Sequence, residues 1–362
     1  LGSYLVLIGT GATLAALAGW KLLPRFWNFL PRDRGRVFAE KAEAAKGKPT
    51  GAGFLFAMLL LPVLFLVLPF SLRLWGVVAC LFLAMLTGYL DDRSTHPWGE
   101  YFKGTLDLGV AFVTALVISR GQAFDIWLPL VKGTFSVPPL LFLPLATLLL
   151  WISINATNCS DGVDGLAGAL TLLSLFYLGG FLYMVIGHSE MAEYLLVPHN
   201  PDGAKWAVLT FSAAGALGGY LWHNAEPSAV LMGDAGSRFL GLLVGVSVIA
   251  TGNPFVILVV APVVLVNGGT GIVKIVLLRT LRSLGFDVRP PDTDAQQTQE
   301  TVTYRSNGAS IALVRLLHCV RFPLHDHCRK KLEWSNPQVL MRFMLLQAFA
   351  TPLLLGLLVK LR

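Results

Sequence analysis

Long apolar runs constrain the fold of this chain more than any other feature. A helix that crosses a bilayer needs about 20 mostly apolar residues. Ten stretches meet or approach that length: 4–23, 51–70, 74–90, 105–119, 138–154, 166–186, 206–222, 239–250, 255–278 and 339–358. Only 14% of the residues are charged, whereas a soluble domain carries about 25%. We therefore predict an all-α polytopic integral membrane protein with about ten transmembrane helices, in a single domain over residues 1–362.

The basic residues indicate which side of the membrane each loop faces. Lysine and arginine crowd the loop at 24–50 and the segment after residue 278, whereas the opposite loops carry only Arg73, Arg120, Lys132 and Lys205. Cytoplasmic loops are the basic ones in membrane proteins. Ten spans then place both termini on the periplasmic or extracellular side. Because the basic residues lie in short loops between apolar runs, they indicate topology and not nucleic-acid binding. On the outer face, residues 123–137 are compatible with a small hairpin.

Two adjacent carboxylates, Asp91 and Asp92, end the third predicted span. Neighbouring negative charges repel each other and are tolerated best beside a cation or in water. Acidic residues are also unfavourable at the C-terminus of a helix. The pair predicts a magnesium and phosphate site or a catalytic base, and the alternative is a solvated helix end.

A second polar segment, at 155–166, joins the fifth and sixth spans. Asn158, Asp161 and Asp164 recur at every third position, so on a helical turn they would share one face. The alternative is that Ser160 or Asp161 caps the next helix. A cap accounts for one of these residues but not for all three, which favours a binding site.

A third carboxylate, Asp234, stands between Gly233 and Gly236 where a helix is predicted to begin. Helix N-terminal amides bind anions, and Mg²⁺ prefers a few carboxylates together with phosphate oxygens of a substrate. This position therefore suits a metal bound to phosphate. The alternative is a helix cap formed by Asp234 or Ser237.

The fourth polar segment, at 321–331, contains His325 and His327 on either side of Asp326, next to several cations. It could hold phosphate or orient a proton donor. Zinc is a rival ligand, because His318, Cys319 and Cys328 are near, but the spacings match no standard finger. A basic patch at the membrane surface is a further alternative. The predicted cytoplasmic cations Lys46, Lys48 and Lys103 could each meet a phosphate as a point charge.

In order and spacing, these motifs resemble the polyprenyl-phosphate N-acetylhexosamine-1-phosphate transferases, and within them the muramoyl-pentapeptide branch. The matching segments are 48–53, 88–92, 155–165, 232–237, 323–327 and 336–343. The resemblance implies a Mg²⁺-dependent enzyme of the bacterial inner membrane that acts in peptidoglycan synthesis. Such an enzyme transfers phospho-N-acetylmuramoyl-pentapeptide from its UDP conjugate to undecaprenyl phosphate, which gives lipid I and UMP. It also implies a homodimer.

The same resemblance implies roles for individual residues. The catalytic group contains the paired carboxylates Asp91 and Asp92, of which Asp91 is the candidate base, together with Asp234 as the magnesium ligand and His325. Asn224 and His325 are expected to hold the diphosphate. The remaining substrate-binding residues are expected to be Lys48, Lys103, Asn158, Asp161, Asp164 and His327.

The chain departs from the family pattern at three positions. Asp326 replaces a histidine, Thr95 replaces a lysine, and Leu231 replaces an aromatic residue that could stack on uracil. The third departure weakens the prediction of base stacking at that position. None of the three affects the proposed metal ligand.

Three other interpretations of the chain compete with this one. A sister transferase would use UDP-N-acetylglucosamine. A transporter would require charges near the bilayer midplane and an internal repeat, and we find neither in the sequence. A structural membrane protein would leave the four polar motifs unexplained.

Overall fold

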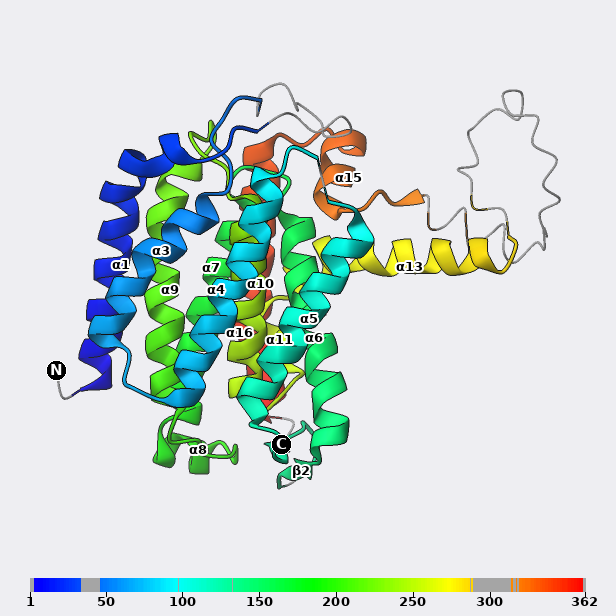
Figure 1. Ribbon diagram of the computed structural model, residues 1–362. Helices are drawn as coiled ribbons and strands as arrows, with labels where there is room; N and C mark the ends of the chain where they lie inside the picture. The colour runs from blue at the N-terminus through cyan, green and yellow to red at the C-terminus, as the bar shows by residue number, and fades with distance from the viewer. Residues whose placement is uncertain are drawn as a thin grey trace, which may run out of the picture.

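The computed structural model describes residues 3–33, 46–96, 98–131, 133–286 and 319–360, together with residues 288, 314 and 317. These residues form a bundle of helices with one small hairpin (Figure 1). The elements are α1 (Tyr4–Phe26), η1 (Trp27–Phe29), α3 (Ala52–Val67), α4 (Leu72–Arg93), α5 (Glu100–Ser119), β1 (Phe124–Ile126), β2 (Phe135–Val137), α6 (Pro139–Ser160), α7 (Leu166–Gly180), η2 (Phe181–Ile186), α8 (Ser189–Tyr194), α9 (Gly203–Asn224), α10 (Gly233–Ala250), α11 (Val256–Val260), α12 (Pro262–Val264), η3 (Leu265–Gly269), α13 (Thr270–Ser283), α15 (Leu324–Lys331) and α16 (Asn336–Lys360).

Helices occupy all ten of the predicted apolar stretches. Within the described residues, eight helices are long and apolar enough to cross a membrane. Helix α3 is apolar but has only 16 residues, and α9 is not among the eight. The prediction of an all-α polytopic membrane protein is confirmed, whereas the number of crossings stays a prediction.

Helix α10 forms the centre of the bundle, and all 18 of its residues are buried. It packs against α3, α4, α6 and α7. Its small residues let neighbouring backbones come close: a Cβ atom added to Gly241 would stand 2.6 Å from the Cα atom of Ile154 on α6. This burial means that a polar group on α10 must find its partners inside the protein.

The predicted ninth span, 255–278, is not one continuous helix. The chain forms α11, α12 and the π-helical turn η3, and α13 then leaves the bundle sideways (Figure 1). Pro262 stands at the first position of α12, where it ends the preceding helix. At Gly268 the chain passes so close to α6 that a Cβ atom would stand 2.0 Å from the carbonyl oxygen of Ala156. The helical character of this apolar run was therefore predicted correctly, but its continuity was predicted wrongly.

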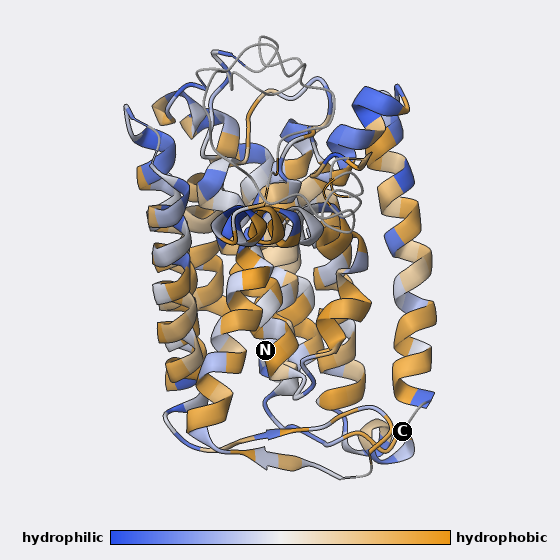
Figure 2. Ribbon diagram, turned by 90° about the vertical axis from the view of Figure 1, so that its right-hand side faces the viewer, coloured by the Kyte–Doolittle hydropathy of each residue, from blue (hydrophilic) through white to orange (hydrophobic). Residues whose placement is uncertain are grey.

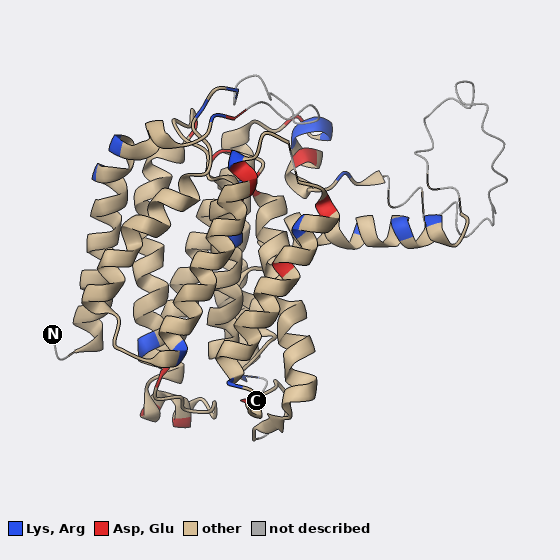
Figure 3. Cartoon of the chain, in the orientation of Figure 1, with Lys and Arg blue, Asp and Glu red and all other residues tan. Residues whose placement is uncertain are grey.

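The two ends of the bundle differ in chemistry. Both chain termini lie at one end, and α15 lies at the other (Figure 1). Many of the charged residues lie at the α15 end of the bundle, and lysine and arginine also lie along α13 (Figure 3). Hydrophobic residues dominate the middle of the bundle (Figure 2). The predicted hairpin is present at the end with the termini, where β1 and β2 pair antiparallel with Phe124 opposite Val137.

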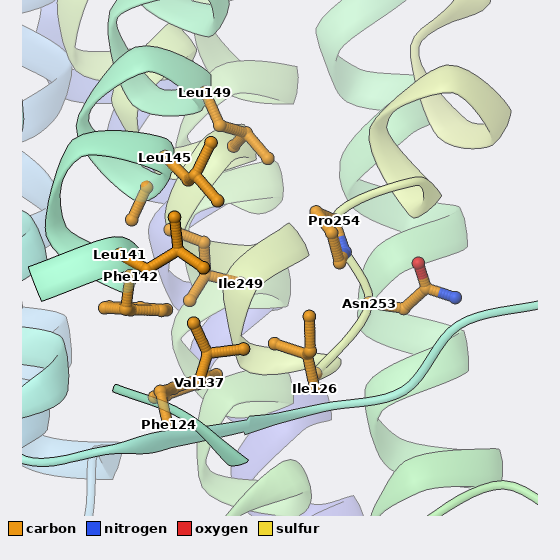
Figure 4. Close-up of a pocket in the computed structure, with 12 residues that line it drawn as sticks. Phe124, Ile126, Val137, Leu141, Phe142, Leu145, Leu149, Ile249, Asn253 and Pro254 are labelled. Atoms are coloured by element: carbon orange, nitrogen blue, oxygen red, sulfur yellow. The ribbon is translucent and has the colours of Figure 1, made fainter. Parts of the chain in front are cut away.

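An apolar cavity of about 160 Å³ lies beside this hairpin. Side chains from the hairpin, from α6 and from the segment after α10 line it, and among the labelled residues only Asn253 carries a polar side-chain group (Figure 4). This cavity has no charged side chain that could bind a phosphate. The charged residues of the predicted motifs lie at the α15 end instead.

Candidate active site

Three helices bring two of the predicted catalytic carboxylates and a predicted substrate-binding lysine together near the α15 end. Asp91 is in the last turn of α4, Lys103 in the first turn of α5 and Asp234 in the first turn of α10. The Lys103 Nζ atom lies 3.2 Å from Asp234 Oδ2 and also contacts Asp91 Oδ2. Two carboxylates and an ammonium group, predicted from three separate motifs, therefore form one cluster.

Glycine makes this convergence possible. A Cβ atom added to Gly88 on α4 would stand 2.3 Å from the carbonyl oxygen of Asp234, and one added to Gly53 on α3 would stand 1.9 Å from the backbone nitrogen of Gly236. The backbones of α3 and α4 thus touch the first turn of α10. A larger residue at either position would push Asp234 away from Asp91.

Asp92 has a different task from its neighbour Asp91. Its Oδ1 atom accepts a hydrogen bond of 2.9 Å from the backbone N–H of Asp234, and its Oδ2 atom accepts one of 3.0 Å from that of Ala235. A carboxylate at these amides satisfies donors that a helix start leaves open, and it meets the positive end of the helix dipole. Asp92 therefore caps α10 from outside the helix, which differs from the alternative of a cap formed by Asp234 or Ser237.

Two charged residues that the sequence analysis missed complete the cluster. The guanidinium group of Arg238 on α10 lies 3.3 Å from Asp107 Oδ1, 3.5 Å from Asp91 Oδ2 and 3.4 Å from Asp234 Oδ2. Asp107 is a lone acidic residue within the predicted span 105–119. An ionisable residue inside an apolar span needs a partner, and this signal was available from the sequence.

The segment at 155–165 enters the site, but not as one helical face. Helix α6 ends at Ser160, and Asp161 leaves the helical conformation with ψ 66°. The Asn158 side chain donates to Ser237 Oγ at 3.0 Å, whereas Asp164 Oδ2 accepts from the backbone N–H of Ser228 at 3.1 Å. The prediction that Asn158, Asp161 and Asp164 share one face is therefore wrong, because the helix stops between them.

Lys48 and Asn224 lie around this same segment. The Lys48 Nζ atom donates to Ser228 Oγ at 3.0 Å and lies 3.9 Å from Asp164 Oδ2. The buried Asn224 accepts from the backbone N–H of Gly165 and donates to the carbonyl of Val230, both at 2.8 Å. Asn224 thus ties two loops together with both ends of its amide. Its predicted contact with a diphosphate stays a prediction.

The histidine loop reaches the site through His325. This side chain is buried, its Nδ1 atom lies 3.1 Å from Asn267 Oδ1, and its ring covers Gly162. Burial lowers the pKa of His325 to about 4, although Asp326 acts in the opposite direction. The ring is therefore neutral at pH 7. The His327 ring instead accepts a hydrogen bond from the backbone N–H of Arg321 at 3.2 Å, which turns it towards its own loop.

The carboxylates fit a magnesium ion in their chemistry. Asp91 Oδ2 and Asp234 Oδ2 both contact the ammonium group of Lys103, so they converge on one cationic position. Within the described residues, no group of three or more His, Cys, Asp or Glu is arranged to hold a metal. His318, one residue of the zinc alternative, lies outside the described residues. Mg²⁺ needs only one or two carboxylates when phosphate oxygens and water supply the other ligands.

The chain has relatives of known name. Residues 74–252 match glycosyl transferase family 4. Over its whole length the chain is 45% identical to the phospho-N-acetylmuramoyl-pentapeptide-transferase of Treponema pallidum strain Nichols, of which it covers 92%. It is 27% identical over 78% of its length to the protein of that name from Helicobacter pylori strain HPAG1, of which it covers 83%. This chain therefore belongs to the family of phospho-N-acetylmuramoyl-pentapeptide-transferases.

Proposed function

We propose that this protein transfers phospho-N-acetylmuramoyl-pentapeptide from its UDP conjugate to undecaprenyl phosphate, in a Mg²⁺-dependent reaction that gives lipid I and UMP. The observation that carries the proposal is the convergence of Asp91, Lys103 and Asp234 from three helices. It lies in a chain 45% identical over its full length to a named transferase.

The reaction exchanges one phosphorus–oxygen bond for another. An oxygen of the lipid phosphate bonds to the phosphorus that carries the sugar, and the bond from that phosphorus to the UMP oxygen breaks. Phosphoryl transfer depends mainly on placing the reactants in line and neutralising charge. Bound Mg²⁺ would supply part of that neutralisation.

The residues of the site divide this work between them. Asp234 and Asp91 would hold the metal, and Lys103 lies beside both carboxylates, where it can neutralise phosphate oxygens. The family resemblance instead implies that Asp91 is the base towards the lipid phosphate, in which case Asp234 alone would hold the metal. Lys48 and Asp164 lie around Ser228, where they can meet the nucleotide. The neutral His325 can donate or accept a hydrogen bond without adding charge.

The orientation of the protein in the membrane follows from the same reasoning. We propose that the α15 end faces the cytoplasm of a bacterium and that both termini face the periplasm. The support is the positive-inside rule together with the position of both termini at the end opposite α15. One substrate is a soluble nucleotide and the other a lipid, so the site must lie at an interface between water and membrane. A homodimer of about ten-span subunits is also proposed, from the family resemblance alone.

The test is an assay of UMP release by the purified protein in detergent. Undecaprenyl phosphate is supplied with either UDP-N-acetylmuramoyl-pentapeptide or UDP-N-acetylglucosamine, with Mg²⁺ or with a chelator. We expect release only with the muramoyl substrate and only with Mg²⁺. Release with UDP-N-acetylglucosamine alone would move the protein to the sister branch. No release from folded protein with either substrate would refute the proposed function.

A further inference from the structure

A fully buried arginine lies directly behind the two carboxylates that converge on Lys103. The side chain of Arg238 is 1% exposed and that of Asp107 is 6% exposed, whereas that of Lys103 is 30% exposed. Lys103 can therefore meet a substrate from the open side of the cluster. Arg238 approaches the same carboxylates from the protein interior and has no such access.

The arrangement follows from helical spacing on two elements. Asp234 and Arg238 are four residues apart on α10 and lie on one face, and Lys103 and Asp107 have the same separation on α5. On α10 the acidic residue comes first and the basic residue follows, whereas on α5 the basic residue comes first. Arg238 can reach Asp107 while it also contacts Asp234 and, across on α4, Asp91.

The burial of this arginine requires an explanation. Removing a guanidinium group from water is costly unless carboxylates compensate it. An apolar side chain such as leucine would pack in the central helix without that cost. What Arg238 adds is a fixed positive charge and a planar fork that contacts carboxylates from two directions.

The charges in the cluster do not balance. In these ion pairs three carboxylates, those of Asp91, Asp107 and Asp234, share two cations, Lys103 and Arg238. Without Asp107, Arg238 would neutralise the carboxylates further. Without Arg238, the charge of Asp107 would be buried with no nearby cation apart from the more distant Lys103.

We infer that Arg238, anchored by Asp107, is a positioning residue that holds Asp91 and Asp234 in their convergent arrangement and weakens their affinity for a free divalent cation. This inference rests on the proposed function in assigning a metal to these carboxylates. The guanidinium group contacts Asp91 Oδ2 and Asp234 Oδ2, the same oxygens that meet Lys103. A divalent cation at these oxygens would be repelled by that fixed charge. The phosphates of a substrate would supply the additional negative charge that secures the cation.

The decisive variant removes both partners together. Arg238→Leu alone leaves Asp107 buried without its partner and would destabilise the protein. The double variant Asp107→Leu/Arg238→Leu buries no unpaired charge and should stay folded. Arg238→Lys keeps the charge but lacks the planar fork that reaches carboxylates on three helices, so it should restore activity only in part. The control is Glu100→Gln/Arg279→Gln, which removes an exposed ion pair of 2.8 Å between α5 and α13.

Two measurements are made on each purified variant in detergent. The first is binding of Mn²⁺ without substrates, followed by electron paramagnetic resonance of the free ion. The second is kcat and KM for UMP release. The double variant loses one charge of each sign, but the lost cation contacts the oxygens of Asp91 and Asp234 directly, whereas Asp107 contacts the other nitrogen of the guanidinium group. We therefore expect Mn²⁺ to bind more tightly, by up to about tenfold, and kcat to fall at least about tenfold with KM for the nucleotide little changed. The control should match the parent in both.

Unchanged or weaker Mn²⁺ binding in the folded double variant would overturn the inference, and so would an unchanged kcat. Failure of the proposed function is recognised separately. In that case the parent protein itself releases no UMP, while the Mn²⁺ titration still decides whether Arg238 acts on the carboxylates.

Discussion

Asp91 and Asp92 are adjacent and carry the same charge, yet the structure predicts opposite consequences when each is altered. Both oxygens of Asp92 accept backbone hydrogen bonds at the start of the central helix α10, at 2.9 and 3.0 Å. Asp91 accepts one long backbone hydrogen bond of 3.3 Å from Trp98 and otherwise faces Lys103 and Arg238. Asp92 should therefore matter for stability, and Asp91 for catalysis.

The magnitudes follow from these contacts. Losing a helix cap costs about 0.5–2 kcal/mol, and a hydrogen bond to a charged group contributes about 1.5–3 kcal/mol. Asp92→Ala removes two such bonds, so it should lower the free energy of unfolding by about 3 kcal/mol. Asp92→Asn keeps one acceptor oxygen and should cost about half as much. Asp91→Asn keeps the shape and one acceptor oxygen of this buried side chain, and the two cations keep Asp234 and Asp107 as partners, so the expected loss is about 1 kcal/mol.

The assay pairs a thermal unfolding curve in detergent with UMP release. Asp92→Ala should unfold several degrees below the parent, with Asp92→Asn between the two. Asp91→Asn should unfold near the parent temperature but lose most of its kcat. The reasoning is refuted if Asp92→Ala unfolds at the parent temperature, or if Asp91→Asn is the less stable of the two.

Three further predictions concern other parts of the site. Asp234→Ala should abolish UMP release in a protein that remains folded, because it removes a carboxylate on which Lys103 and Arg238 converge; retained turnover would exclude a role for Asp234 as metal ligand. Asp326→His should keep kcat within about threefold of the parent, since Asp326 is partly exposed and lies 3.7 Å from its partner Arg329; a large loss would show that this chain depends on the carboxylate. Folding lowers the pKa of His325 from 6.5 to about 4, so between these pH values the unfolded chain binds more protons than the folded protein. The free energy of unfolding should therefore be highest above pH 6.5 and should fall by up to about 3 kcal/mol as the pH is lowered towards 4. Unfolding curves at pH 7 and pH 5 measure this loss, and His325→Asn should flatten it.

The membrane class and most of the site could be predicted from the sequence because they depend on local pattern. An apolar run of about 20 residues is helical in a bilayer whatever it packs against. Polar segments interrupt such runs only where the chain leaves the membrane or lines a site. Asp91 and Asp234 were selected for such reasons and Lys103 as a predicted cytoplasmic cation, and the structure brings the three into one cluster.

Only the tertiary structure could decide how the charges are shared. Nothing in the local sequence distinguishes Asp91 from Asp92. They differ because Asp92 accepts hydrogen bonds from the first amides of α10, which are 142 and 143 residues further along the chain. The same holds for Arg238, whose burial follows from the central position of α10. It also holds for α13, because its helical sequence does not determine the direction in which it leaves the bundle. A sequence pattern gives each residue its chemistry and its local conformation, whereas partners and burial are set by contacts between distant segments.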